Sequence, residues 1–302
     1  MQLLNKYKLF LIEQDLSPIS IKGYIYDIGY FDNWVKDFYQ TEISLDEVSS
    51  NDIHAYREYL LKIQRRKPTT INRRIQSLKR FYSWLLRIKQ RSDDPTLNIR
   101  FIKRSPNKKP ESLTKAEVHA LLTMAGRSNY GLDKRNYALV QLLLQSGLRV
   151  SEVASLQIRD LVIKERSGFV TVVEGKGKKN REVALNATAR RAISNYLDTK
   201  KITFEDEYLF TNKSKQAITI RALQKIIKSL AEKANITRIK VSVHTLRHTF
   251  ATHYLQANPS KLADLAVIMG HESIDTTTIY TKPSKTQLAE SIERSGINIY
   301  GN

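Results

Sequence analysis

The sequence contains no cysteine, and only seven prolines and eleven glycines occur in its 302 residues. The absence of cysteine excludes disulfides, thiolate metal sites and cysteine nucleophiles, and it is typical of an intracellular protein. No uncharged apolar run reaches the roughly 18 residues of a membrane span, and the N-terminal MQLLNKYKLFLIEQDL has no apolar core of signal-peptide length. We therefore expect a cytoplasmic protein that has no membrane partner.

Acidic side chains are scarce relative to basic ones, since 30 Asp and Glu face 50 Lys and Arg, for a net charge of +20. Residues 1–61 carry 5 basic and 10 acidic side chains, residues 62–109 carry 16 and 2, and residues 110–302 carry 29 and 18. A short basic run is often only a solvated surface. Here, however, the basic residues alternate with apolar ones that belong in a core, and this balance favours a protein that neutralises nucleic-acid phosphates.

Apolar residues recur three and four apart through the first 90 residues, which predicts about four helices. Helices are predicted to start at Ser17-Pro18, at Ser49 to Asp52 and at Pro68 to Thr70, where capping residues or a proline stand. The helix that follows Pro68 has one apolar stripe and, off that stripe, a basic face that suits a helix lying in or beside a DNA groove. Together with later basic segments it supplies the DNA-binding candidates Thr69, Thr70, Asn72, Arg73, Arg74, Lys79, Arg80, Lys103, Arg104, Lys178 and Lys179.

The stretch NIRFIKRSPNKKPESL, residues 98–113, breaks the helical periodicity and combines prolines with many Lys and Arg. It predicts a boundary between a helical domain at 1–100, a basic linker at 101–112 and a second domain at 113–302. Trp34 and Trp84 of the first domain are expected in its core rather than as platforms for base stacking.

The second domain is expected to open with a helix capped by Thr114 and Glu117. A helix at 134–146 and a β-hairpin of residues 169–173 and 181–185 follow, the hairpin closed by a turn rich in Gly and Lys. Further helices are expected near 187–199, 219–234, 244–257, 260–269 and 284–294. The predicted fold class is mainly α, with a small β-sheet or hairpin that makes the second domain α+β.

The segment VHTLRHTFATHYL, residues 243–255, places His244, Arg247 and His248 on one face of a helix. Zinc is one interpretation of histidines four residues apart, but the HExxH pattern is absent and no acidic or Cys ligand is nearby. A purely structural set of polar side chains is the other alternative.

Four more residues carry groups that complement phosphate chemistry. Arg149 lies in an apolar stretch that should be buried, so it needs a partner, and Glu152 is three residues away. Lys176 lies between two glycines at the expected hairpin tip. His271 follows a glycine, and Tyr280 comes nine residues later.

The order of Arg149, Lys176, His244-x-x-Arg247, His271 and Tyr280 resembles the active-site signature of the tyrosine recombinase (integrase) family. The local sequences SGLRVSE, GKGKKNREV, HTLRHTFATH and MGHESIDTTTIY carry the resemblance, which spans the second half of the chain from SLTKAE to Tyr280. The helical first half resembles the core-binding, SAM-like domain of the Xer branch.

The resemblance implies a role for each residue of the signature. Tyr280 would attack the scissile phosphodiester and form a 3′-phosphotyrosine, with His244 as general base or hydrogen-bonding partner. Arg149 and Arg247 would hold the non-bridging oxygens. Lys176 would protonate the leaving 5′-oxygen, His271 would hydrogen-bond a phosphate oxygen and Glu152 would orient Arg149. Neither a metal nor another cofactor is implied. Outside the signature, His248 and His253 are interpreted as structural and Tyr254 as a core residue.

The resemblance also implies a C-shaped, two-domain clamp around double-stranded DNA with inverted half-sites. It implies a homotetramer of two dimers on that DNA, joined through the tail at 284–302, although this tail could equally pack on its own subunit. An accessory protein or a second recombinase is left open, as is the role: resolution of chromosome dimers, resolution of transposon cointegrates, or integration and excision of a mobile element. Two alternatives remain: a type IB topoisomerase and a catalytically idle DNA-binding protein.

Overall fold

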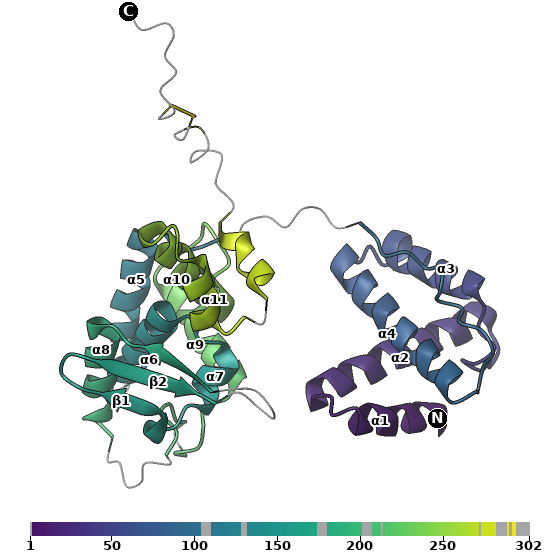
Figure 1. Cartoon of the computed structure of the whole chain (residues 1–302), viewed down its shortest axis with the longest axis horizontal. Helices are drawn as coiled ribbons and strands as arrows, with labels where there is room; N and C mark the ends of the chain where they lie inside the picture. Colours follow the sequence, from purple (N-terminus) through teal and green to yellow (C-terminus); the bar gives the residue numbers. More distant parts are fainter. Residues whose placement is uncertain are drawn as a thin grey trace, which may run out of the picture. The chain divides into compact units, whose positions relative to one another are not determined.

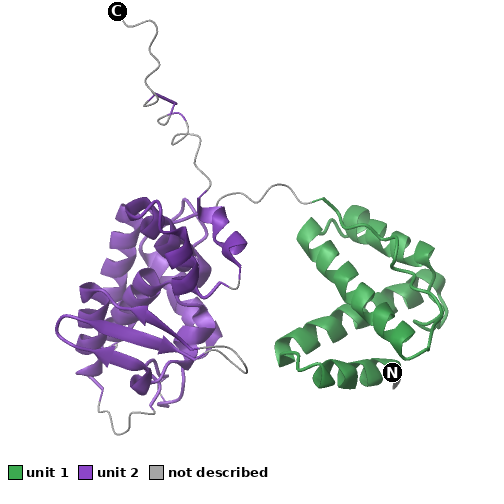
Figure 2. Ribbon diagram, in the orientation of Figure 1, with its two compact units in different colours: residues 1–107 green, residues 108–302 purple. Residues whose placement is uncertain are grey.

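The computed structural model describes residues 2–103, 110–127, 132–173, 180–200, 207–212, 214–271, 273–281, 289 and 292–293. The chain forms two compact units, residues 1–107 and 108–302 (Figure 2). The division falls inside the segment 101–112 that the sequence predicts as a linker. Among the described residues, no helix is long and apolar enough to cross a membrane.

Unit 1 is built from helices whose starts the sequence marks (Figure 1). The Ser17 side chain accepts a hydrogen bond from the backbone N–H of Ser20 at the start of α2, and Ser49 forms a capping box with Asp52 at the start of α3. Pro68 is the first residue of α4. The elements are α1 (Gln2–Glu13), α2 (Pro18–Tyr39), α3 (Ser50–Glu58), a π-helical turn η1 (Tyr59–Ile63) and α4 (Pro68–Arg87).

The core of unit 1 combines aromatic and aliphatic side chains where α4 packs against α1 and α2. The predicted stripe of α4 is buried, and Trp34 and Trp84 are core residues as expected. Asp27 of α2 is also buried, and its carboxylate accepts hydrogen bonds from Arg73 and from the hydroxyl of Ser77, both on α4. A buried carboxylate is tolerated only when it is paired in this way, so the contact fixes α2 against α4.

Unit 2 combines helices with a three-stranded antiparallel sheet in the order β1-β2-β3. Val170 of β2 pairs with Leu161 of β1 and Val183 of β3. The predicted hairpin and the Thr114–Glu117 capping box are confirmed. The elements are α5 (Lys115–Gly126), α6 (Asp133–Ser146), α7 (Val150–Ser155), η2 (Ile158–Asp160), β1 (Leu161–Ile163), β2 (Gly168–Val172), β3 (Arg181–Ala184), α8 (Ala187–Leu197), α9 (Ile220–Lys233), α10 (Val243–Ala257), α11 (Leu262–Met269), η3 (Ile274–Thr276) and η4 (Thr278–Tyr280).

Helix α6 is the centre of unit 2 and contacts α5, α8 and α10. Its residues from Ala138 to Leu144 are all buried and, apart from Gln141, all apolar, as expected for a helix surrounded by others. Helix α10 packs on α6 and also contacts α11 and η4, and this packing brings the three signature segments at 243–257, 262–271 and 278–280 together. The last predicted helix, near 284–294, falls mostly outside the described residues.

Candidate active site

Helix α10 directs Arg247 into the protein. Ser242 caps the helix, and the Arg247 side chain, only 7% exposed, donates to the carbonyl oxygens of Gly147 and Met269. Burial, reinforced by the nearby charge of Arg149, lowers the pKa of Arg247 to about 10. The guanidinium is therefore still a cation at neutral pH, and it is held from two sides.

Arg149 and Glu152 form the pair that the sequence predicts. Arg149 lies at the N-cap of α7, where the Glu152 carboxylate accepts a hydrogen bond from its backbone N–H (2.7 Å) and another from its guanidinium Nη1 (2.8 Å). The other terminal nitrogen of Arg149 donates to the carbonyl oxygen of Gly270. The Arg149 side chain is 39% exposed, so it is fixed in direction and still reaches solvent.

Arg181, at the start of β3, is part of this cluster and was not a sequence candidate. Its Nη1 and Nη2 donate to the two carboxylate oxygens of Glu152 at 3.1 and 2.9 Å, and its Nε donates to the carbonyl oxygen of Ile268. Burial alone would raise the pKa of Glu152, but hydrogen bonds from Arg181 and Arg149 bring it below the usual range. Glu152 is therefore ionised and holds two arginines at once. Arg181 was not a candidate because nothing in the sequence distinguishes it from the other basic residues around the hairpin.

His271 follows the left-handed turn at Gly270 (φ 63°) that ends α11. Its Nδ1 is 2.7 Å from the hydroxyl oxygen of Thr277. Burial and the charges of Arg247, Arg149 and Arg181 lower the pKa of His271 to about 4. At neutral pH the ring is uncharged and can donate a hydrogen bond to an anion through its other nitrogen if Nδ1 accepts from Thr277.

Tyr280 lies at the end of η4 and is 4% exposed, packed among apolar residues of α10 and α11. Its hydroxyl oxygen is 2.7 Å from Nδ1 of His248. Burial raises the pKa of Tyr280 above its usual value, and the charge of Arg247 only partly opposes this. His244, which the family resemblance assigns to this tyrosine, is exposed in the first turn of α10. The contact of His248 with Tyr280 was missed because His248 lies outside the family signature, and because only the packing of η4 on α10 shows which of two histidines one turn apart meets Tyr280.

Several predicted residues lie outside the described residues, namely Lys176, Lys178, Lys179 and Arg104. Their roles stay predictions. Among the residues that the structure describes, no group of three or more His, Asp or Glu is arranged to hold a metal ion.

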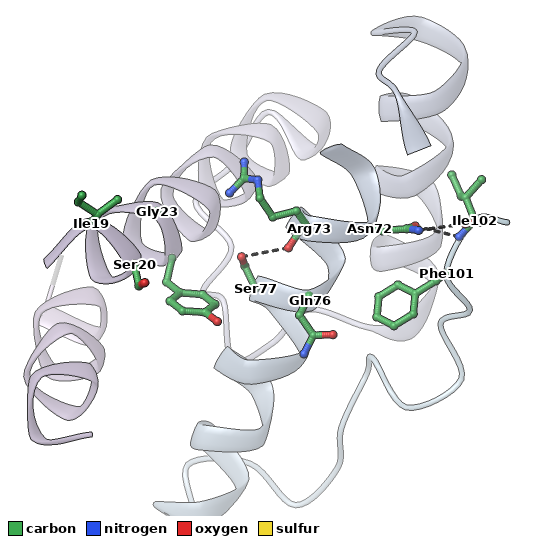
Figure 3. Close-up of a pocket in the computed structure, with 10 residues that line it drawn as sticks. Ile19, Ser20, Gly23, Asn72, Arg73, Gln76, Ser77, Phe101 and Ile102 are labelled. Carbon is green, nitrogen blue, oxygen red and sulfur yellow. Dashed lines mark hydrogen bonds between the residues drawn. The ribbon is translucent and has the colours of Figure 1, made fainter. Parts of the chain in front are cut away.

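The DNA-binding candidates of unit 1 differ in their surroundings. Thr69, Arg73 and Lys103 are exposed, whereas Thr70, Lys79 and Arg80 are partly buried. Asn72 and Arg74 are buried. The Asn72 amide exchanges two hydrogen bonds of 2.9 Å with the backbone of Ile102, beside a cavity of about 750 Å³ between α2, α4 and residues 101–102 (Figure 3). The Arg74 guanidinium lies 3.7 Å from the centre of the Tyr30 ring.

Contacts of these residues with DNA stay predictions. The two buried side chains, Asn72 and Arg74, have protein partners, Ile102 and Tyr30.

Comparison with known proteins gives the family. Residues 111–287 match the phage integrase family, and residues 4–89 match the phage integrase N-terminal SAM-like domain. The chain belongs to the phage integrase family. Among curated relatives of this recombinase, tyrosine recombinase XerD of Oceanobacillus iheyensis is 36% identical over 92% of each chain. Tyrosine recombinase XerD of Listeria innocua is 32% identical over 95% of this chain and 96% of the relative.

Solved structures agree with this assignment. The crystal structure of XerA recombinase is 27% identical, covers 98% of both chains and superposes with a TM-score of 0.55. The post-cleavage complex of XerH site-specific recombinase with a palindromic difH substrate, 23% identical, covers 93% of this chain and 81% of the other with a TM-score of 0.75, which shows the shared fold. This chain is an Xer-like site-specific tyrosine recombinase, an enzyme that cuts and rejoins DNA, and the topoisomerase alternative is not favoured.

Proposed function

We propose that this recombinase cuts DNA with Tyr280 and holds the scissile phosphate between Arg149 and Arg247. The observation that carries the proposal is the convergence of both guanidinium groups on one turn. Arg247 donates to the carbonyl oxygen of Met269 and Arg149 to that of Gly270, and His271 is the next residue. One backbone turn thus sets the spacing of three phosphate-binding side chains.

The chemistry explains the choice of these side chains. A planar guanidinium can bind two phosphate oxygens at once, and fixed cations stabilise the negative charge that builds up in the transition state. Attack by Tyr280 on phosphorus forms a 3′-phosphotyrosine and releases a 5′-hydroxyl. Because the phosphotyrosine conserves the energy of the phosphodiester, a later 5′-hydroxyl can rejoin the strand without ATP.

The remaining signature residues complete the cycle. Lys176 would donate the proton that the leaving 5′-oxygen needs. His244, which the resemblance gives as general base or hydrogen-bonding partner of Tyr280, is exposed at the start of α10, where a bound phosphate could reach it. Glu152 orients Arg149, and its hydrogen bonds to both the backbone and the guanidinium of Arg149 support this role.

We further propose that the substrate is double-stranded DNA with inverted half-sites, bound by a homotetramer in which the tail at 284–302 joins neighbouring protomers. The net charge of +20 supports DNA binding, and the solved relatives include XerH bound to its difH substrate. The C-shaped clamp and the cytoplasmic location stay predictions, and the requirement for an accessory protein or second recombinase stays open.

The test is to incubate purified protein, without metal or ATP, with a supercoiled plasmid library of host and mobile-element DNA. Protein-linked 3′-ends are then mapped by sequencing. We expect adducts at one pair of inverted half-sites with wild type and with the control Tyr254→Phe, and none with Tyr280→Phe. Whether that pair lies in chromosomal or mobile-element DNA would also give the biological role.

Two results would contradict the proposal. Scattered adducts with relaxed plasmid would indicate a topoisomerase-like activity, and tight binding without any adduct would indicate a DNA-binding protein that does not cut.

A further inference from the structure

The hydroxyl group of Tyr280 already has a hydrogen-bonding partner in the DNA-free protein. Nδ1 of His248 lies 2.7 Å from the Tyr280 hydroxyl oxygen, and the two rings are 5.6 Å apart between their centres. His248 directly follows Arg247 on α10, and Tyr280 comes from η4, which packs on α10. The contact is therefore fixed by the same packing that brings Tyr280 near Arg247.

The groups around this pair determine which atom carries the proton. His244 and Arg247 on α10 face His248, as do Tyr280 of η4 and His271 after α11. Burial, followed by the charges of His244 and Arg247, lowers the pKa of His248 below its usual value. The pKa of Tyr280 is raised by its burial. Near neutral pH, a neutral phenol therefore donates to a neutral imidazole, whose proton must be on Nε2.

We propose that His248 is the residue that accepts the proton of Tyr280 during DNA cleavage. This inference rests on the proposed function, in which Tyr280 is the nucleophile. As the bond between the Tyr280 oxygen and phosphorus forms, the phenol proton moves to Nδ1 of His248. The bond from phosphorus to the 5′-oxygen breaks, and that oxygen leaves with a proton from Lys176. On rejoining, His248 returns its proton to the departing Tyr280 oxygen, and Lys176 regains one from the attacking 5′-hydroxyl.

The surrounding charges make this transfer depend on bound DNA. An imidazolium next to Arg247 is unfavourable in the free protein, because both groups would be cations in a partly buried site. A phosphate held by Arg149 and Arg247 brings negative charge to the same place and offsets that cost. His248 is therefore a weak base until substrate binds, which keeps the nucleophile protonated between reactions.

His244 is less well placed for this step. It lies one helical turn before His248, is exposed, and therefore presents its ring to substrate rather than to the buried hydroxyl of Tyr280. A contact of His244 with a phosphate oxygen is compatible with both this position and the family signature.

The test compares His248→Phe, which removes the acceptor, with His248→Asn, whose amide oxygen can replace Nδ1 as an acceptor but cannot take up a proton. His253→Asn is the matched control. His253 lies on the same helix but lines a cavity of unit 2 together with Phe250 and Tyr254, away from the Tyr280 hydroxyl. The substrate is a duplex half-site at the mapped cleavage position, with a 5′-bridging phosphorothiolate. Its sulfur leaving group needs no proton, so the rate of adduct formation reports the nucleophile without the contribution of Lys176.

We expect His248→Phe to slow adduct formation by about 100-fold or more, the usual contribution of a general base, while DNA binding in a gel-shift assay is unchanged and the variant still unfolds cooperatively. The wild-type rate should fall as the pH is lowered through the depressed pKa of His248, which protonates the acceptor. His248→Asn should be slow and lack this acidic limb, and it serves as the decisive variant if His248→Phe does not fold. His253→Asn should match wild type.

Wild-type rates and an unchanged pH profile in the folded His248 variants would overturn the inference alone. A wild-type protein that forms no adduct with any DNA would overturn the proposed function and this inference together.

Discussion

At the scale of single residues, the site depends on one carboxylate. Glu152, 11% exposed, accepts hydrogen bonds from Arg181 and Arg149, and it also interacts electrostatically with Arg247. Removing the carboxylate would leave arginines crowded together without a counter-charge. Removing Glu152 should lower the free energy of unfolding by more than its ion pairs with the arginines contribute, because a buried positive charge then loses its partner.

We predict that Glu152→Gln lowers the free energy of unfolding at pH 7 by about 3 kcal/mol. The folded-state pKa of Glu152 lies below its ordinary value of 4.5, so its contribution is fully present above about pH 4.5 and is lost as the pH falls through the folded-state pKa. Urea unfolding at several pH values should therefore show a steeper acid loss for wild type than for Glu152→Gln. The control is Glu182→Gln, an exposed carboxylate on β3 that should retain the wild-type acid dependence. Equal slopes in wild type and Glu152→Gln would disprove the role of Glu152.

A second prediction concerns Gly270, whose φ of 63° favours glycine and whose Cβ, if present, would lie 2.8 Å from Cζ of Arg181. Gly270→Ala should displace Arg181 and the turn that spaces Arg149, Arg247 and His271. Because misplacement of about 1 Å can cost 100-fold in rate, we expect a loss of that order in adduct formation.

The control for Gly270→Ala is Gly29→Ala on α2, where nothing lies within 4 Å of the added methyl group. It should leave cleavage unchanged and stabilise the helix by about 1 kcal/mol in thermal or urea unfolding. Equal cleavage rates for the two variants would show that the Gly270 turn does not set the site.

At the scale of secondary-structure elements, the sequence predicts most of the helices because their ends carry side chains that satisfy free backbone groups. Ser17, Ser49 and Thr114 are examples, and each accepts a hydrogen bond at the predicted start. The shortest elements were not predicted. Strand β1 has three residues, η3 and η4 have three each, and no periodicity can be detected over such lengths. The π-helical turn at residues 59–63 was likewise expected as ordinary helix.

The candidate site was predictable to the extent that its residues form a motif along the chain. Arg149, Glu152, Arg247, His271 and Tyr280 were all candidates. The pairing of Arg181 with Glu152 and of His248 with Tyr280 joins residues about 30 apart in the sequence, and each depends on how separate elements pack. A tertiary contact of this kind leaves no periodic or local signal.

The contact between α4 and residues 101–102 gives a prediction at this scale. Asn72→Ala removes both hydrogen bonds to the Ile102 backbone and should lower the free energy of unfolding by about 1–2 kcal/mol. The amide hydrogen of Ile102 should also exchange faster with solvent. Gln76→Ala, an exposed change one turn later on α4, is the control. Unchanged exchange at Ile102 in Asn72→Ala would show that this contact does not hold the segment.

At the scale of the whole molecule, the net charge of +20 is distributed so that residues 1–61 are acidic and the rest of the chain is basic. Binding through several phosphates releases counterions, so we predict that the affinity of Tyr280→Phe for duplex DNA falls about 1000-fold between roughly 50 and 200 mM salt. In a plot of the logarithm of the DNA-binding constant against the logarithm of the salt concentration, Lys103→Gln should make the slope less steep by about one, as expected for one lost phosphate contact. Lys8→Gln, an exposed change in the acidic region, should leave the slope unchanged. Indistinguishable slopes for these two variants would argue against a phosphate contact by Lys103.

The most direct test of the account is to identify the residue that carries DNA after cleavage. Wild-type protein is trapped on the phosphorothiolate half-site, digested with trypsin and nuclease, and analysed by tandem mass spectrometry. The account predicts a nucleotide on Tyr280, within the peptide of residues 262–285 that ends at Lys285 because trypsin does not cut before Pro283. A nucleotide on Tyr254, in the peptide of residues 248–261, or on any other residue would contradict it.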